Sequence, residues 1–209
     1  MRKIKRFKIS TRQKEITRKI LRLGLDLAPA GLDGEIALAN FLKETAAQID
    51  PGTVYELNEN VLWDVGGETL SAEGMFSACV VTLGPQCTRW AEDFPPAKCL
   101  AAQTVLFEFL RTACLFVTDL VKEQAEKEEC ETLEPQFLYI PKLGLAPEPK
   151  LFKEAARTEA AQAAKILPEV LKRVQAEKID VCWQDGALQP QATAAFIVPW
   201  QKKKRKGKK

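Results

Sequence analysis

The segment from Tyr139 to Pro149 carries the residues best suited to binding a small ligand. Its sequence, YIPKLGLAPEP, contains three prolines, which restrict the backbone, and Gly144, which lets a ligand approach the backbone closely. The ammonium group of Lys142 could pair with an anionic group there, although a single lysine on a loop often meets only water. Tyr139, Lys142 and Gly144 are therefore the candidate ligand-binding residues. The alternative is an ordered connection that crosses the surface without binding anything.

Several kinds of enzyme chemistry are excluded by residues that the chain lacks. It has no histidine, which removes Ser-His-Asp and Cys-His nucleophile pairs, imidazole zinc sites and the usual neutral-pH proton shuttle. Neither GxxxxGK followed by Ser or Thr nor GxGxxG occurs, so a nucleotide-dependent enzyme is not expected. Carboxylates crowd together at Glu128, Glu129 and Glu131, but this highly charged run predicts a solvated surface rather than an acid–base pair. We assign no catalytic residue, and whether the chain is an enzyme stays open.

The cysteines are too scattered to form a metal site. The six of them are separated by 8, 12, 15, 16 and 52 residues, so no CxxC pair exists and neither structural zinc nor an iron–sulfur cluster is expected. Cys114 falls in an apolar helical run and is interpreted as a small core residue. The N-terminal sequence MRKIKRFKIS has no uninterrupted apolar stretch, so no signal peptide is expected. We therefore expect a cytoplasmic protein with reduced thiols.

Charge is distributed unevenly along the chain, whose formal net charge is only +3. Residues 1–22 contain ten basic side chains and one acidic, residues 202–209 contain seven basic and none acidic, and the part between contains 14 basic and 27 acidic. Basic ends on an acidic body can fold back on it, or can bind nucleic acid or another acidic protein. We divide the chain into a basic N-terminal segment (1–10), a single domain (11–200) and a basic disordered tail (201–209).

The elements that must position these residues begin with helices and then change to strands. Apolar spacing predicts a basic amphipathic helix over 11–22 and a second helix over 33–49, which Pro51-Gly52 stops. Two short strand patterns follow. After them, an almost continuously apolar run predicts a third, buried strand that leads into a short helix around Arg89 and Trp90. These three predicted strands cover residues 54–57, 61–63 and 78–83.

The second half of the chain opens with the strongest helical pattern, from Lys98 to about Glu129. Its first part is apolar nearly all round, but Glu108, Arg111 and Asp119 interrupt it, so a central core helix is expected rather than a membrane span. The remaining predictions are a strand over 137–140, a helical stretch over 151–177 bent near Pro168, and strands over 179–183 and 193–198. This order predicts an α+β fold, in which a mainly antiparallel twisted sheet packs with a long central helix.

Four short motifs along this order of elements also resemble a known family. Residues 20–24, ILRLG, resemble the end of its entry helix, and residues 80–84, VVTLG, resemble the strand that precedes its long helix. The proline-rich loop around Gly144 occupies the place of its adenosylmethionine-binding loop, and residues 191–197, QATAAFI, resemble its closing strand. The family is the activation (reactivation) domain of cobalamin-dependent methionine synthase, together with the small stand-alone proteins similar to it.

The resemblance implies an accessory role beside a corrinoid-binding protein or methyltransferase subunit. In the family, this domain docks on the cobalamin-bearing domain and binds adenosylmethionine, so that accidentally oxidised cobalamin is reductively remethylated. The chain would then bind no cofactor tightly, because its partner would carry the cobalamin and would supply the histidine that ligates the cobalt. The absence of histidine from this sequence agrees with that division of labour. The protein would supply docking and orientation, and the cofactor would supply the chemistry.

The loop departs from the family pattern at two positions. The family has an Arg-x-x-x-Gly-Tyr core, whose guanidinium can grip the carboxylate of adenosylmethionine through two hydrogen bonds. Here Ile140 stands four residues before Gly144, and Leu145 follows it. Lys142 is nearby but is a point charge without the planar fork. We therefore predict that adenosylmethionine binds weakly or not at all.

A second role stays open. The basic ends could make phosphate contacts in a nucleic-acid- or ribosome-associated protein, with no membrane involved, although no recognised nucleic-acid module accompanies them. An independent adenosylmethionine-dependent enzyme is disfavoured, because neither a glycine-rich nucleotide loop nor a general base is evident.

Overall fold

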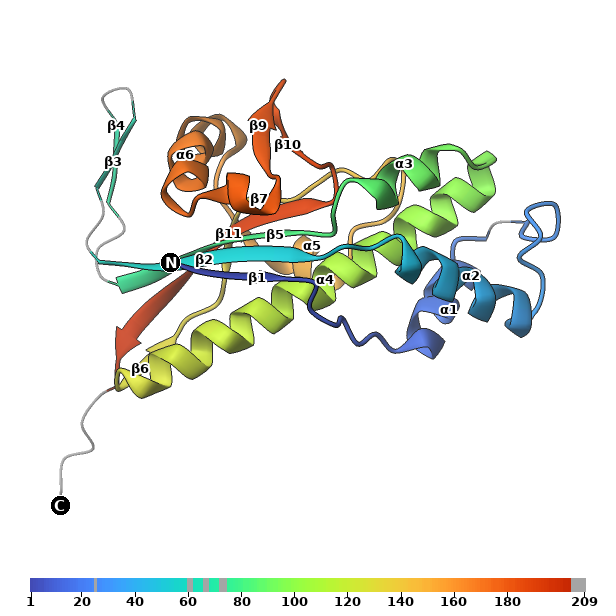
Figure 1. The fold of residues 1–209 in the computed structure, drawn as a ribbon, viewed down its shortest axis with the longest axis horizontal. Helices are drawn as coiled ribbons and strands as arrows, with labels where there is room; N and C mark the ends of the chain where they lie inside the picture. Colours follow the sequence, from blue (N-terminus) through green and yellow to red (C-terminus); the bar gives the residue numbers. More distant parts are fainter. Residues whose placement is uncertain (25, 60–61, 66–67, 72–74, 204–209) are drawn as a thin grey trace, which may run out of the picture.

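A mainly antiparallel sheet forms the centre of the protein (Figure 1). The computed structural model describes residues 1–24, 26–59, 62–65, 68–71 and 75–203. Within these residues the strand order is β1-β2-β5-β11-β7-β8, with β6 paired to the far end of β11, and only β7 and β8 run parallel. The strands are β1 (Arg2–Lys5), β2 (Gly52–Glu59), β5 (Met75–Thr82), β6 (Cys130–Thr132), β7 (Gln136–Tyr139), β8 (Ala156–Arg157) and β11 (Thr193–Lys202). The α+β fold with an antiparallel sheet is as the sequence predicts.

Both faces of the sheet are covered, which explains why the central strands are apolar almost throughout. In β5, Cys79 and Val81 belong to one hydrophobic cluster, whereas Ala78 and Val80 belong to a second cluster on the other face. Successive side chains of a strand point to opposite faces, so two buried faces require apolar residues at consecutive positions. The predicted buried strand at 78–83 is confirmed, and it lies beside both β2 and β11.

The long helix α4 (Pro96–Lys127) crosses one face of the sheet. It begins with Pro96 at its first turn, where proline removes no intrahelical hydrogen bond. The same layer contains α1 (Gln13–Leu21), α2 (Glu35–Ala47), α3 (Gln86–Glu92) and α5 (Lys150–Glu154). By length and composition α4 could cross a membrane, but 67% of its most apolar window is buried inside the protein. The predicted core helix is therefore confirmed.

The opposite face carries a smaller layer. It consists of α6 (Ala160–Arg173), the 3-10 helix η1 (Ala176–Ile179) and the hairpin of β9 (Cys182–Gln184) and β10 (Ala187–Gln189). A second hairpin, β3 (Leu62–Val65) with β4 (Glu68–Ser71), projects beyond the end of the sheet at the upper left of Figure 1. Residue 61, at the start of the strand predicted over 61–63, lies outside the described residues.

The continuous helical stretch predicted over 151–177 is wrong. The chain forms α5, then the short strand β8, then α6 and η1. Local propensity favours helix in this alanine- and glutamate-rich segment, but Ala155 is extended, and the backbone N–H of Thr158 donates to the carbonyl of Phe137 in β7. Pairing with the sheet thus overrides local preference. Pro168 lies inside α6, so the helix continues past it.

The two basic ends begin on the sheet itself. Residues 2–5, in the segment that the sequence sets apart from the domain, form the edge strand β1, which pairs with β2 over four residues. At the other end, Gln201 and Lys202 still belong to β11, and the backbone N–H of Lys203 donates to the carbonyl of Glu129. The rest of the predicted disordered tail, 204–209, lies outside the described residues.

Candidate functional site

A cavity of about 510 Å³ opens beside the end of β7, on the face covered by α6. Its walls come from four places: the end of β7 and the loop after it, β8, α6, and the β9–β10 hairpin with the residues that follow. A volume between about 300 and 1,000 Å³ is usual for a site that binds a small molecule. The polar or aromatic residues of the wall are Phe137, Tyr139, Lys142, Arg157, Thr158, Trp183, Gln189 and Gln191.

Two aromatic rings form one part of the wall. Tyr139 ends β7, and Trp183 comes from β9, with the rings edge to face at 5.9 Å between centroids and 88° between planes. Burial raises the pKa of the Tyr139 phenol above its ordinary value of 10, and a backbone hydrogen bond with Leu188 partly opposes this. The phenol therefore stays protonated near neutral pH and can donate a hydrogen bond as well as pack against a flat apolar group.

Two cations give the cavity an electropositive side. Lys142 is exposed on the loop after β7, and no ion pair links it to another described residue. Arg157 comes from β8, where it pairs with Phe137 across the sheet. Its Nη2 donates to the carboxylate of Glu148 and, at 2.6 Å, to the carbonyl of Phe152. Because a guanidinium has five N–H donors, the remaining N–H groups can bind an anionic ligand.

Gly144, the third candidate, does not line this cavity. Its backbone has φ +54°, in the left-handed region, and a Cβ at this position would overlap the side-chain amide of Gln103 on α4. The left-handed backbone conformation favours glycine here, and a larger residue would also displace the end of the Gln103 side chain. The structure brings Tyr139 and Lys142 to one wall and leaves Gly144 on the side that faces α4.

Sequence reasoning missed Arg157, Trp183 and Gln189 as residues of this site. Arg157 falls inside the stretch expected to be helical, and the strand that carries it, β8, is only two residues long. Trp183 lies 44 positions after Tyr139 in the sequence, and the hairpin that brings the two together is not marked by a strong alternating pattern. A Gly at 186 after Asp185 was the one local signal for a tight turn there.

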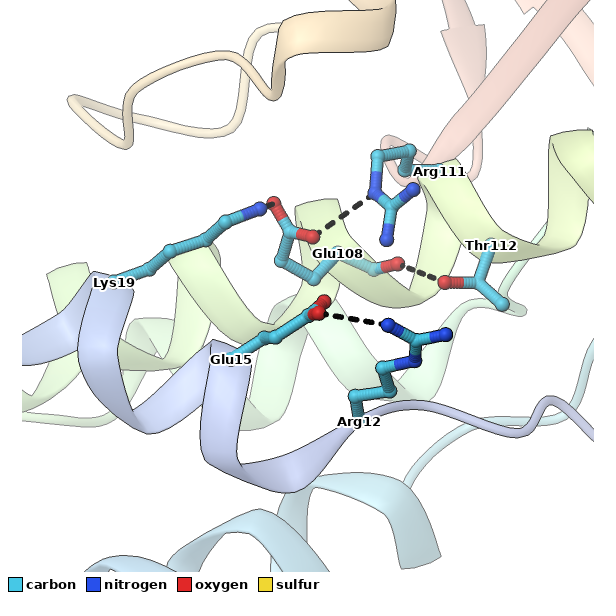
Figure 2. A network of polar contacts seen from close by, with 6 residues as sticks. All are labelled: Arg12, Glu15, Lys19, Glu108, Arg111 and Thr112. Carbon is cyan, nitrogen blue, oxygen red and sulfur yellow. Dashed lines mark hydrogen bonds and ion pairs between the residues drawn. The ribbon is translucent and has the colours of Figure 1, made fainter.

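A second polar cluster joins the basic helix α1 to α4 (Figure 2). Glu108 is almost completely buried, and its two carboxylate oxygens accept hydrogen bonds from Lys19 of α1 and from Arg111 one turn along α4, the latter at 3.0 Å. A buried ionised carboxylate is stabilised when charged, hydrogen-bonding partners compensate for its lost hydration. Arg12 and Glu15 form a separate, exposed pair on α1. This cluster lies on the α4 side and is an anchor between helices.

The described residues contain no grouping of histidine, cysteine or carboxylate side chains that could hold a metal ion. The six thiols are free, and four of them are buried. Burial raises the pKa of Cys87 to about 12 and also raises the pKa values of Cys79 and Cys114. These thiols therefore stay protonated at neutral pH and act as small core residues, as expected for Cys114.

Comparison with known proteins identifies the fold. No protein-family model matches the sequence, and no curated protein matches it. Among solved structures, the chain is similar to the MetH reactivation domain, whose crystal structure contains bound AdoHcy. The TM-score is 0.51 at 12% sequence identity, and the match covers 98% of this chain and 79% of that one. The chain thus has a fold like that of a reactivation domain along nearly all of its length.

Proposed function

We propose that the protein is an accessory subunit of a corrinoid-dependent methyltransferase of the methionine synthase type, which docks on the corrinoid-bearing protein and supports its reactivation. The observation that carries this proposal is the fold similarity to the MetH reactivation domain over 98% of the chain. It agrees with the motif resemblance at residues 20–24, 80–84 and 191–197, which depends on the sequence alone.

The ligand proposed for the cavity belongs to the adenosylmethionine and AdoHcy class. Such a ligand has a carboxylate at one end and a flat purine at the other. The cations of Lys142 and Arg157 suit the carboxylate, and the rings of Tyr139 and Trp183 suit the purine. The volume of about 510 Å³ is also adequate for a molecule of this size.

Arg157 bears directly on the prediction of weak or absent binding. That prediction rests on the missing arginine of the loop, where Ile140 stands instead. A guanidinium nevertheless lines the same cavity, because β8 runs beside β7 and carries Arg157 there. We therefore propose that the protein binds AdoHcy measurably. Titration of AdoHcy into the protein distinguishes this proposal from the weak or absent binding predicted from the loop sequence.

The corrinoid in this role belongs to the partner. Since this chain has no histidine, it cannot supply an imidazole ligand to cobalt. When bound to the partner, the corrinoid would supply the reductive methylation chemistry, with adenosylmethionine as the methyl donor. The residues of this chain would hold the donor by its carboxylate and purine and orient it toward the docked protein.

Affinity capture tests the docking role. The tagged full-length protein is used to capture partners from a native extract at about 50 mM and about 300 mM NaCl, and the ultraviolet–visible spectrum of the retained material is recorded. Corrinoid absorption bands retained at both salt concentrations support the proposal. Retained material without corrinoid bands at either concentration contradicts it. As a control for non-specific adsorption, the capture is repeated with a bait protein in which exposed lysines far from the cavity are replaced by acidic residues.

A further inference from the structure

The first 22 residues carry exposed cations that the fold does not neutralise. Lys5, Arg6 and Arg12 form ion pairs with Asp180, Asp50 and Glu15 respectively, and Lys19 pairs with Glu108. The other basic side chains of this stretch are exposed, and no ion pair links them to the described part of the chain. They are Arg2, Lys3, Lys8, Lys14, Arg18 and Arg22. We call residues 2–22 the basic arm.

The basic arm is held in place along its length. β1 pairs with β2, and Phe7 stacks on Phe116 of α4 with 4.9 Å between ring centroids. Farther along, Ile16 and Ile20 of α1 lie in the core, and Lys19 is tied to the buried carboxylate of Glu108 (Figure 2). The unpaired cations therefore project from a fixed scaffold, so little backbone conformational entropy is lost when they bind a partner.

The arm is also extended in shape. In Figure 1 it follows the edge of the sheet from the N-terminus and ends in α1 at the other end of the molecule. Among the described residues of the arm, the large exposed hydrophobic one is Leu21, near its end. Phe116 of α4, on which Phe7 of the arm stacks, is 36% exposed. A protein interface is usually built around a broad apolar centre with charges at the rim, whereas here a few exposed apolar side chains lie among six unpaired cations. A phosphate backbone needs only spaced cations.

The charge on the rest of the chain restricts where a polyanion can bind. Between the basic ends, residues 23–201 contain 14 basic and 27 acidic side chains. That acidic body repels phosphates, so the basic arm is the favourable surface within the described structure.

From these observations we propose that the basic arm binds the phosphate backbone of nucleic acid without reading its sequence. This interaction is independent of the corrinoid-related function and of the cavity. It differs from a role for the C-terminal tail alone, because the cations that carry it lie on β1, on α1 and on the segment between them.

Fluorescence anisotropy with a labelled 20-base-pair DNA duplex tests this proposal on the full-length protein. The arm variant carries Lys8→Gln, Lys14→Gln, Arg18→Gln and Arg22→Gln. The matched control carries four exposed lysines of other elements replaced in the same way, so that the net charge is identical: Lys122→Gln, Lys127→Gln, Lys153→Gln and Lys172→Gln. Circular dichroism melting curves verify that both variants fold.

The arm variant is expected to bind the duplex at least about tenfold more weakly than the wild type at 100 mM salt, and the control to bind like the wild type. Each phosphate contact contributes about −0.9 to the slope of log K against log salt. Loss of four contacts should therefore make the slope shallower by about 3 to 4. An equal loss of affinity in both variants would overturn the proposal, since overall charge or the tail would then explain binding.

Two further measurements do not depend on a folded variant. Lysine acetylation of the wild type with and without the duplex should protect Lys3, Lys8 and Lys14, and unchanged reactivity at all three would contradict the proposal. A polyglutamate peptide of matched charge should compete at least about tenfold less effectively than unlabelled duplex. Equal competition would favour an acidic protein as the partner and overturn the assignment to nucleic acid.

Discussion

Arg157 is the side chain on which the proposed ligand site most depends. It supplies a guanidinium to the cavity from β8, and two of its N–H groups are already used by Glu148 and by the carbonyl of Phe152. Arg157→Gln removes the charge and keeps a shorter, polar side chain. The expected consequence is weaker binding of AdoHcy without loss of the fold.

The magnitude follows from the exposure of the side chain. A hydrogen bond to a charged group contributes about 1.5 to 3 kcal/mol when it is shielded from water. The Arg157 side chain is 43% exposed, so solvent screening places the expected loss near the lower limit, at about 1.5 kcal/mol. This corresponds to an increase of about tenfold in Kd.

Isothermal titration calorimetry with AdoHcy measures this effect, and Glu148→Gln is the matched control. Both variants lose the Arg157–Glu148 ion pair, but only Arg157→Gln loses the cation. Glu148→Gln frees the guanidinium and is expected to bind AdoHcy as tightly as the wild type or more tightly. Equal weakening in both variants would refute the reasoning, because the ion pair would then matter only for holding the loop.

Three more predictions concern the anchor and the titratable groups. Glu108→Gln leaves Lys19 and Arg111 without their shared carboxylate. Breaking a fully buried pair lowers the free energy of unfolding by about 3–5 kcal/mol, but these cations are 40% and 27% exposed, so we expect a loss of about 2 kcal/mol. Circular dichroism should show this as a decrease of about 4–8 °C in Tm. The exposed-pair control Glu15→Gln should shift Tm by less than about 2 °C, and equal shifts would contradict the anchoring role. In the native protein, a thiol reagent should label Cys182 rapidly, Cys99 slowly and the buried thiols only after unfolding; rapid labelling of all six would contradict the described core. Because the pKa of Tyr139 is raised, the native state holds the phenolic proton more tightly than the unfolded state does. The free energy of unfolding should therefore decrease as the pH rises above about 10. In alkaline denaturation curves, Tyr139→Phe should remove that part of the decrease.

The main layers of the fold could be predicted from the sequence because their patterns are strong and local. The 78–83 run is apolar at consecutive positions since both faces of β5 are buried, and the pattern from 98 to 129 marks α4 because its apolar residues continue over many turns. The strand β1 and the break between α5 and α6 could not be predicted in this way. Each depends on pairing with a strand distant in the sequence, β2 for β1 and β7 for β8.

The same distinction applies to the cavity. Tyr139 ends β7 and Lys142 lies three residues later on the loop that follows, so one proline-rich segment of the sequence indicates both. The same pattern points to Gly144, but its glycine is explained by the left-handed backbone and by the closeness of Gln103 on α4, which the local sequence does not show. Arg157 and Trp183 join the site through β8 and the β9–β10 hairpin, and neither short element has a periodic pattern long enough to predict.

The most direct test of the reactivation role measures the return of an oxidised corrinoid to its methylated form. The captured corrinoid protein, in its cob(II) form, is incubated with adenosylmethionine and a chemical one-electron reductant, with and without this chain, and the visible spectrum is followed with time. We predict that the wild-type chain accelerates formation of the methylated corrinoid and that Arg157→Gln accelerates it less. The same rate with and without the chain, at concentrations where the two proteins are bound, would contradict the account.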